Sequence, residues 1–421
     1  MIEKLNEQPT KAKKRIDLLD IYRGFAILGI FVVNIVIMNS TFLNQDEFAK
    51  QWTSNVDLIT TKTLQLFFYT KFFPIFSLLF GLGISMQALK LFDQNRLSFT
   101  FFARRMSILF IIGALHIILL WSGDVLNLYA ILGLFTTLMI KKSNKLILSL
   151  SALFFFFPFY DQLLEYFFTL VNFRPETYLS KHTGETVNQI IREGSYWEGM
   201  KLRLLEYLSN IPMLFGFLAP IAASMFLLGL YLGKNKVYQS LGSFIQRIKK
   251  PMLLLAITTN VYRLTFLFVL VKHEIFSSEI HRQIFIKAMV LSDVVMGLFY
   301  LWAIGWLYCN TKWKKILSPL KYAGRMALTN YVMQSLIGLI LFSSIGFGLY
   351  ETLSPSKALL TAIVIFVFQV LSSTIWLTHF RFGPLEWAWR CLTYRELLPI
   401  RKKKNVADDL HQNSSLSTKT E

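Results

Sequence analysis

The 421-residue sequence predicts an all-α polytopic membrane protein with about ten transmembrane helices and both termini in the cytoplasm. The first observation is composition: 54% of the residues are hydrophobic and 16% are charged, against about 25% charged in a typical soluble domain. The second is a series of apolar runs long enough to cross a bilayer, and the third is an alternation of basic residues between those runs. This composition excludes a disordered chain and disfavours a soluble enzyme.

Ten apolar runs make up the predicted spans, because a helix needs about 20 mostly apolar residues to cross the hydrocarbon layer. The third and fourth runs are short and are separated only by Ser122-Gly123-Asp124, which predicts a tight hairpin. The fifth run is interrupted by Pro158 and is the least regular. The runs lie at residues 21–40, 64–89, 106–121, 125–140, 146–168, 211–233, 252–271, 288–309, 326–350 and 358–378.

Basic residues predict the orientation. With the N-terminus inside, 30 of the 44 Lys and Arg residues fall on cytoplasmic segments and 12 on external ones, while Arg23 and Arg263 fall within spans. An excess of Lys and Arg on the cytoplasmic side is typical of membrane proteins, so the net charge of +19 indicates orientation and predicts no nucleic-acid partner. The two cysteines and the scattered histidines show no metal-ligand spacing, so no metal site is predicted.

The predicted organisation has five parts. Residues 1–20 are a basic cytoplasmic N-terminus, residues 21–168 and 211–400 are two helical halves, and residues 401–421 are a polar, disordered tail. Residues 169–210 form an extracytoplasmic loop with one or two surface helices, either a lid over a site or an inert loop. The first apolar run lacks a small-residue cleavage site, so it is interpreted as a retained helix and not as a signal peptide.

Arg23 and Asn34 lie on one face of the first span, because eleven residues make about three helical turns, or about 16 Å. Arg23 is either a cytoplasmic anchor paired with Asp20 or Asp17, or a ligand for a phosphate or carboxylate. The planar guanidinium suits the second role, since it can donate two parallel hydrogen bonds to such an anion.

His116 and Asp124 form a candidate acid–base pair near the external face. An imidazole can act as a general base at neutral pH, and a carboxylate can orient it. The two residues are eight positions apart, so contact requires the hairpin to fold back. The alternatives are an interhelical hydrogen bond for His116 and a helix cap for Asp124.

Two further sets of charges lie in or near spans. Lys71 stands near an external end, where its ammonium group can extend to the interface or bind substrate. Arg263 lies in mid-span and requires a buried partner, for which Asp293 is the candidate. That pair is either a structural ion pair or part of a substrate site.

The last candidates lie in the second helical half. Asn330 and Gln334 share a helix face and predict either interhelical hydrogen bonds or contact with a polar cavity. Arg325 and Glu386 lie near the cytoplasmic face, the latter in a short interfacial helix where it can pair with Arg390. The sequence thus predicts an inner polar region of Arg23, Arg325 and Glu386 and an outer one of Asn34, Lys71, His116 and Asp124.

Several of these residues belong to segments that resemble a known family. On these segments, and over most of residues 15–400, the chain resembles the YeiB-type bacterial inner-membrane proteins, whose C-terminal half is a domain of unknown function. It is more distantly similar to the transmembrane acyltransferases, which include the lysosomal heparan glucosaminide acetyltransferase and bacterial O-acyltransferases of surface polysaccharides. The segments are Arg23–Gly29 through Asn34, Lys71–Gly83, His116–Tyr129, Gly324–Ser335 and Phe382–Tyr394.

The resemblance implies a multi-pass protein of the bacterial plasma membrane, with an acyltransferase-like signature in residues 21–168. It implies transfer of an acyl group from cytoplasmic acyl-CoA to a hydroxyl or amine of an acceptor in the cell envelope. The chain departs from the pattern at two positions: Asn34 stands where the O-acyltransferases have a histidine, and Lys71 precedes Phe73-Pro74 where the glucosaminide enzyme has its catalytic histidine nearby.

We therefore expect an acyltransferase-like protein in the lipid bilayer, with acyl-CoA as donor substrate and no tightly bound cofactor. Arg23 and Arg325 would hold the CoA phosphates, and Asn34 would donate a hydrogen bond to the acyl oxygen. His116, oriented by Asp124, would be the base, with Lys71, Asn330, Gln334 and Glu386 as further binding residues. Two alternatives stay open: a transporter of a small anionic or lipidic molecule, with Arg263 and Asp293 as coupling pair, and a non-catalytic envelope-maintenance protein.

Overall fold

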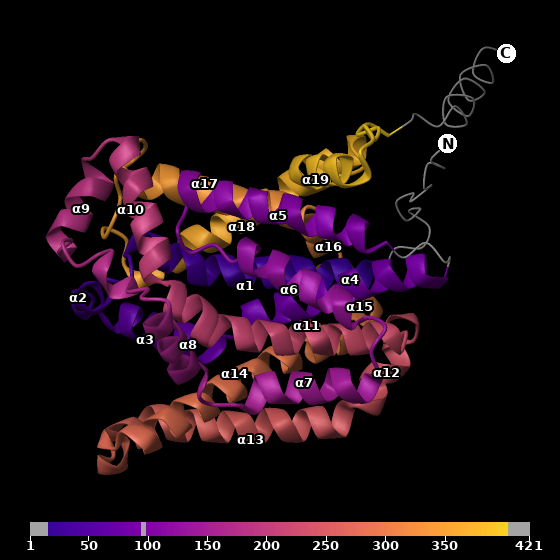
Figure 1. Cartoon of the computed structure of the whole chain (residues 1–421), viewed down its shortest axis with the longest axis horizontal. Coiled ribbons are helices and arrows are strands. Elements are labelled where there is room, and N and C mark those ends of the chain that lie inside the picture. The colour runs from indigo at the N-terminus through magenta and orange to yellow at the C-terminus, as the bar shows by residue number, and fades with distance from the viewer. Residues whose placement is uncertain (1–15, 94–97, 403–421) are drawn as a thin grey trace.

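The computed structural model describes residues 16–93 and 98–402, and within them the chain is helical, with one isolated β-bridge between Phe380 and Arg401. The all-α membrane class predicted from the sequence is confirmed. The predicted basic N-terminus before residue 16 and the tail from residue 403 lie outside the described residues. The long helices run side by side, as Figure 1 shows.

Seven helical segments in the described part are long and apolar enough to cross a membrane. They are α1 (Asp17–Asn39), α3 (Asn55–Phe67) continued by α4 (Phe72–Asp93), α5 (Phe99–Leu119), the π-helical turn η3 (Met213–Leu218) continued by α11 (Ala219–Lys234), α13 (Lys249–Phe268), α14 (Glu279–Tyr308) and α18 (Pro355–His379).

Seven such segments are fewer than the ten transmembrane helices predicted from the sequence, so the predicted count is not confirmed. The fifth predicted run forms two helices, α7 (Asn144–Phe156) and α8 (Tyr160–Leu170), with Pro158 in the break between them. The two helices are bent by 86° relative to each other, and they add an eighth candidate span only if they are counted as one. Two other runs form the short helices α6 (Leu126–Met139) and α17 (Ala327–Phe342). At 1.5 Å per residue these reach only about 21–24 Å, less than the roughly 30 Å hydrocarbon thickness.

The short helices gather at the two ends of the bundle (Figure 1). We call one the loop end; it carries α2 (Gln45–Lys50), α9 (Gly184–Arg192) and α10 (Tyr196–Ser209). The last two helices belong to the loop predicted at residues 169–210. We call the other the basic end; it carries α12 (Leu241–Arg247), α15 (Thr311–Leu317), α16 (Leu320–Arg325) and α19 (Pro384–Tyr394).

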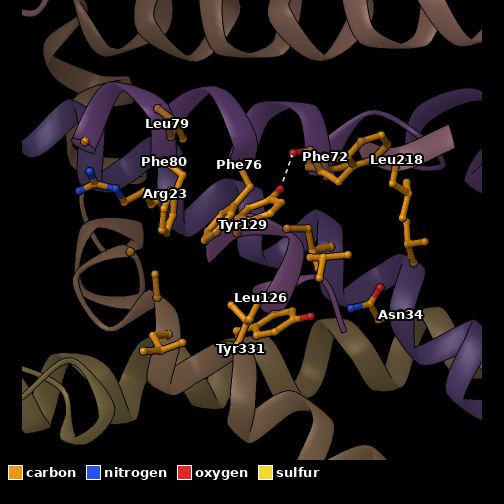
Figure 2. A pocket seen from close by; sticks show the side chains of 18 of the residues that line it. Arg23, Asn34, Phe72, Phe76, Leu79, Phe80, Leu126, Tyr129, Leu218 and Tyr331 are labelled. Atoms are coloured by element: carbon orange, nitrogen blue, oxygen red, sulfur yellow. Dashed lines mark hydrogen bonds between the residues drawn. The ribbon is translucent and has the colours of Figure 1, made fainter. Parts of the chain in front are cut away.

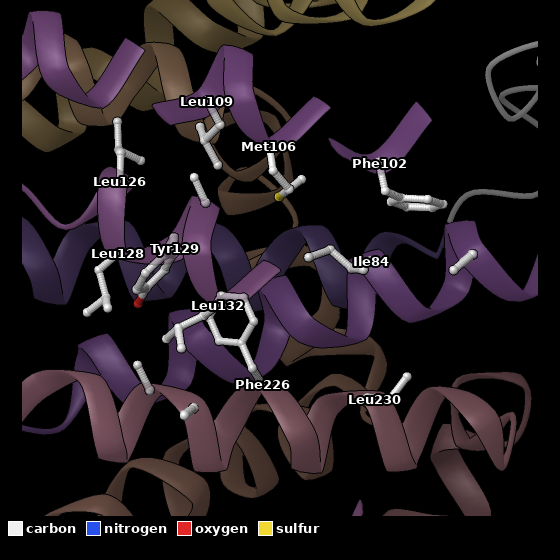
Figure 3. Packing of buried hydrophobic residues seen from close by; sticks show 14 of the residues in the cluster. Ile84, Phe102, Met106, Leu109, Leu126, Leu128, Tyr129, Leu132, Phe226 and Leu230 are labelled. Carbon is white, nitrogen blue, oxygen red and sulfur yellow. The ribbon is translucent and has the colours of Figure 1, made fainter. Parts of the chain in front are cut away.

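The apolar core lies among α4, α5, α6 and α11, where Ile84, Met106, Leu132 and Phe226 interdigitate (Figure 3). Glycines allow these helices to approach closely: a Cβ on Gly81 would meet the backbone of Phe226 on α11. Close backbone approach through small residues is typical of membrane helices, which gain no hydrophobic free energy from packing against each other in lipid.

A second glycine contact positions the basic end. Gly24 on α1 faces the carbonyl oxygen of Leu320, and Gly324 on α16 faces that of Asp20, so the two helices touch through their backbones. This contact brings α16, with Arg325 at its C-terminal end, alongside the part of α1 that carries Arg23.

Replacing Gly24 by Ala is expected to destabilise the protein by about 1–3 kcal/mol, because the added methyl group would collide with a backbone carbonyl that cannot rotate away. Thermal denaturation in detergent measures the effect. Gly242→Ala is the matched control, since a Cβ there meets nothing within 4 Å. Equal melting temperatures for the two variants would show that the α1–α16 contact tolerates the extra atom.

Candidate functional site

One elongated cavity of about 1750 Å³ lies inside the bundle. Its walls come mainly from α1, α4, α5, α6, α17 and α19, with further residues from α2, α3 and α16, and most lining side chains are apolar. Figure 2 shows Arg23 and Asn34 on its border, with Phe76, Phe80 and Tyr129 between them and Tyr331 across from Tyr129. We call this the main cavity.

Arginines border the main cavity at the basic end. Nη1 of Arg23 lies 2.9 Å from Oδ1 of Asp20, which is the ion pair that the sequence offered as one alternative. A Cβ on Gly83 would stand 3.3 Å from Nη2 of Arg23, so this glycine leaves room for the guanidinium group. Arg325 borders the same region of the cavity.

Further basic residues, none of them predicted as part of a site, border the main cavity at the basic end. Arg105 on α5 lies with its guanidinium carbon 3.8 Å from the ring centroid of Trp389, and Arg390 on α19 lies 4.8 Å from that of Phe382. Both residues line the main cavity, as do Lys90 and Lys236. In the sequence, Arg390 was interpreted only as a possible partner of Glu386, and Arg105, Lys90 and Lys236 only as markers of orientation.

Asn34 lines the main cavity farther along α1, on the helix face that also carries Arg23. The three-turn spacing therefore places both side chains on one passage, as the helical periodicity predicts. The Asn34 amide can donate and accept hydrogen bonds there, but it cannot take up a proton as a base.

The hairpin between α5 and α6 folds back and brings His116 and Asp124 together. Nδ1 of His116 lies 3.3 Å from Oδ1 of Asp124, and both side chains are buried. The phenol of Tyr331 donates a hydrogen bond of 2.9 Å to the same oxygen, and its ring stacks on the imidazole at a centroid distance of 5.4 Å. We call these three residues the relay.

Asp124 makes both contacts that the sequence offered, one with His116 and one with the start of a helix. Its second carboxylate oxygen accepts a hydrogen bond of 3.0 Å from the backbone N–H of Leu126 at the start of α6. One carboxylate therefore caps this helix and faces His116 and Tyr331. Among the three relay residues, however, only Tyr331 lines the main cavity. Sequence reasoning did not single out Tyr331, because an aromatic residue in an apolar helix is normally a packing residue.

Lys71, Arg263 and Asp293 form a buried triad. Oδ1 of Asp293 lies 2.7 Å from Nζ of Lys71 and 2.8 Å from Nε of Arg263. Lys71 is fully buried, so it does not extend to the interface. Its ammonium group donates hydrogen bonds to the carbonyl oxygens of Gln65 and Tyr69, and Arg263 donates to that of Leu66.

The triad stabilises a break in the membrane-spanning helix. The chain between α3 and α4 turns through Thr70, whose φ is +67°, and leaves the last carbonyls of α3 without helical partners. The two cations satisfy those carbonyls, and the carboxylate of Asp293 contacts both and offsets one of the two positive charges. The triad residues do not border the main cavity, although Gln65, Tyr69 and Thr70 do.

Asn330 and Gln334 lie in an interhelical network away from the main cavity. Asn330 donates hydrogen bonds to Ser373 and to the carbonyl of Ala323, while Gln334 donates one of 2.9 Å to Gln369 on α18. The polar face therefore joins α17 to α18, which is one of the two alternatives that the sequence left open.

Glu386 borders the main cavity, but both of its carboxylate oxygens accept hydrogen bonds that cap the start of α17. It accepts hydrogen bonds from the backbone N–H groups of Leu328 and Thr329, at 2.7 and 3.1 Å, and from the Thr329 hydroxyl at 2.6 Å. Burial raises the pKa of this carboxyl, and the hydrogen bonds oppose that shift. Its position holds α19 against the start of α17 at the basic end.

Comparison with other proteins finds relatives along nearly the whole chain. A family model described as a protein of unknown function (DUF418) matches residues 232–396. The uncharacterized protein YxaH of Bacillus subtilis (strain 168) is 28% identical over 416 residues, which are 95% of this chain and 99% of the relative. The uncharacterized protein YeiB of Escherichia coli (strain K12) is 27% identical over 404 residues, 91% and 98% respectively.

A third relative, an uncharacterized 39.9 kDa protein of Bacillus acidopullulyticus, is 28% identical over 414 residues, or 94% of this chain and 99% of the relative. No solved structure matches the chain. Within the described residues no three His, Cys, Asp or Glu side chains are grouped to hold a metal ion.

Proposed function

We propose that this chain, which is similar to the YeiB-type proteins and matches the DUF418 model over residues 232–396, carries an acyl group through its main cavity from cytoplasmic acyl-CoA to an extracytoplasmic acceptor. The proposal includes ten membrane crossings in the bacterial plasma membrane, with the basic end and both termini in the cytoplasm. One observation carries it: the same cavity is lined by arginines at one end and, farther along, by Tyr331, whose hydroxyl is bonded to Asp124.

The basic mouth suits the CoA part of the donor. Arg23 and Arg325 face the cavity from two helices held together by the Gly24–Gly324 contact, so both guanidinium groups can reach one pyrophosphate. Arginine binds phosphate with two parallel hydrogen bonds and keeps its charge in any surroundings. The apolar walls beyond the mouth would hold the pantetheine arm and the acyl chain.

The chemical step would take place between Asn34 and Tyr331. The acceptor oxygen attacks the thioester carbonyl, a carbon–oxygen bond forms and the carbon–sulfur bond breaks. The acceptor's proton passes to the Tyr331 oxygen as the phenol proton moves toward Asp124 and His116, and the relay finally protonates the leaving thiolate. The Asn34 amide donates a hydrogen bond to the carbonyl oxygen as negative charge develops there.

Tyr331 and Asn34 would thus be the residues that touch substrate. His116 and Asp124 would act through Tyr331, because they lie behind it. This arrangement differs from a direct attack on the acceptor by an imidazole, and it gives the chain a route for the proton although position 34 is not a histidine.

CoA binding is the first test. Purified protein in detergent is expected to melt several degrees higher with excess acyl-CoA, because a ligand that binds only the folded state stabilises it. Arg23→Ala and Arg325→Ala should each raise the half-saturating concentration of acyl-CoA by about tenfold or more, as expected for loss of a charge-assisted contact. Arg174→Ala, an exposed residue in the loop after α8, is the control. The proposal would be refuted if the parent protein showed no acyl-CoA hydrolysis and also no CoA-dependent stabilisation.

The main cavity also supports a second candidate, transport of a small anionic or lipidic molecule, because Gln45 and Trp52 of the loop end border it as well. Substrate flux in proteoliposomes without CoA would favour this function. The Arg263–Asp293 pair is a weak coupling element, since it is occupied in the triad and lies off the cavity. A deletion phenotype fully restored by a protein with His116→Ala and Asp124→Ala would favour the non-catalytic role.

A further inference from the structure

Helix α10 is fastened onto the loop end of α5, the helix that carries His116. Nε of Arg203 donates a hydrogen bond of 3.0 Å to the carbonyl of Ile118, and the Tyr196 hydroxyl donates one of 2.9 Å to that of Leu119. These carbonyls belong to the last turn of α5, where helical partners are lacking. The helix itself begins with a capping box formed by Ser195 and Glu198.

A third contact joins α10 to the relay turn. The Ser122 hydroxyl donates a hydrogen bond of 2.8 Å to the carboxyl of Glu206, and both side chains are buried. Ser122 lies two residues before Asp124 in the same hairpin. The position of Glu206 therefore constrains the turn from which Asp124 reaches His116 and Tyr331.

A small cavity of about 80 Å³ lies beneath α10, and we call it the α10 pocket. Arg203 and Glu206 line it from α10, and Ser335 lines it from α17. Ser335 follows Tyr331 by one helical turn on the same face. In the described part of the chain, Oγ of Ser335 and Nη2 of Arg203 are buried without a hydrogen-bond partner, so the pocket has room for polar occupants such as water.

The α10 pocket adjoins the main cavity. Trp121 and Ile37 line both, so these two side chains form the wall between them. The Trp121 ring lies over Gly123, where a Cβ would collide with the indole. An opening of α10 would therefore expose the wall beside the relay to the solvent at the loop end.

We propose that α10 is a lid over the relay, with Glu206 as a positioning residue that holds Asp124 through Ser122, and that the lid closes when Glu206 is protonated and loosens when it is ionised. The control of acyl transfer by this lid rests on the proposed function. The movement of the lid itself does not, and it can be measured without any turnover.

The electrostatics of Glu206 support this proposal. Burial raises the pKa of its carboxyl to about 7, and the Ser122 hydrogen bond and the charge of Arg203 only partly offset that effect. Tyr350, the group that faces Glu206 from the segment after α17, has a pKa raised by burial and stays neutral near pH 7. Asp124 in the adjoining turn adds a second carboxyl group to this region.

The sign of the effect follows from that raised pKa. An exposed glutamic acid has a pKa of about 4.3, so the closed state binds its proton more tightly than the open state does. Closure is fully favoured below about pH 4, and it weakens as the pH rises through about 7, where a buried carboxylate must form.

Thiol labelling of a cysteine in the α10 pocket tests the lid. Ser335→Cys is introduced into the full chain with Cys309→Ser and Cys391→Ser, and N-ethylmaleimide is the probe. Because Ser335 makes no hydrogen bond, the change to cysteine removes no contact. Ser180→Cys, exposed in the same loop as α10, provides the reference rate that corrects for the pH dependence of thiols.

The corrected rate is expected to rise about tenfold between pH 5.5 and 8.5, as Glu206 passes from mostly protonated to mostly ionised. Glu206→Gln should keep the rate low at both pH values, and Ser122→Ala should keep it high at both. Glu198→Gln, an exposed acid on the same helix, should retain the parental pH dependence. A rate independent of pH in the parent, or a pH dependence that survives Glu206→Gln, would overturn the lid. Failure of acyl-CoA binding with intact pH-dependent labelling would overturn acyl transfer alone.

Discussion

Asp293→Asn is expected to destabilise the protein by about 3–5 kcal/mol, enough to prevent folding of a marginally stable bundle. The substitution would leave the Lys71 ammonium and the Arg263 guanidinium, both fully buried, without a compensating charge. Chemical or thermal denaturation in detergent, or the yield of monodisperse protein if the variant does not purify, measures the loss.

Lys71→Met provides the comparison within the triad. It leaves Arg263 and Asp293 as a charge-balanced pair, and it removes the Lys71–Asp293 contact and the donor to the carbonyls of Gln65 and Tyr69. We expect a smaller loss, about 1–3 kcal/mol, for the carbonyls left unsatisfied. Ser292→Ala, a neighbour on α14 whose hydroxyl bonds only its own helix, is the control. Parental stability of Asp293→Asn would contradict a charge-compensating role for the aspartate.

Tyr331→Phe is expected to lower acyl transfer by about 10²–10⁴-fold with little change in acyl-CoA binding, because it removes the one relay hydroxyl that faces the main cavity. The rate of acyl transfer at saturating donor, measured beside the donor concentration at half-maximal rate, separates the two effects. His116→Gln should reduce the rate in the same way, since the relay would lose its final proton holder.

Tyr129→Phe is the matched control for this prediction. Its hydroxyl also belongs to a residue that lines the main cavity, but its hydrogen-bond partners are Ser77 and the carbonyl of Phe73 and not a residue of the relay. We expect this variant to stay within a few-fold of the parent rate. Equal losses in both tyrosine variants would indicate that packing around the cavity, and not proton transfer, limits the rate.

The all-α class and the positions of most long helices were predictable from the sequence, whereas the contacts within the site largely were not. Apolar runs give the helices directly, because a backbone in lipid must satisfy its own hydrogen bonds. The lengths of the runs were a poorer guide to the number of helices long enough to cross a membrane. The helices α6 and α17 are apolar but short, and the run at residues 146–168 bends by 86°. Hydropathy indicates that a segment is excluded from water, but it does not indicate where a helix ends or bends.

Site residues were predictable where helical periodicity alone decides, as for Arg23 and Asn34, which share a face of α1. The approach of His116 to Asp124 depends on a hairpin that folds back, and Glu206 reaches Ser122 across 84 positions. Contacts of that kind arise from tertiary packing, so no regular spacing of residues in the sequence predicts them. Lys71 was placed at an interface because its partners, Asp293 and Arg263, lie on other helices.

The main cavity is lined by residues from both the loop end and the basic end, so it bears on the leakage of protons and ions through the protein. The plasma membrane stores energy as a difference in proton concentration and voltage, and a water-filled passage would discharge it. Phe76 and Phe80 lie 5.9 and 5.6 Å from the Tyr129 ring, measured between centroids, on the wall of the main cavity. In a chain that crosses an energised membrane as proposed, the two phenylalanine rings offer water no hydrogen-bond partner, so this part of the wall disfavours a continuous file of water.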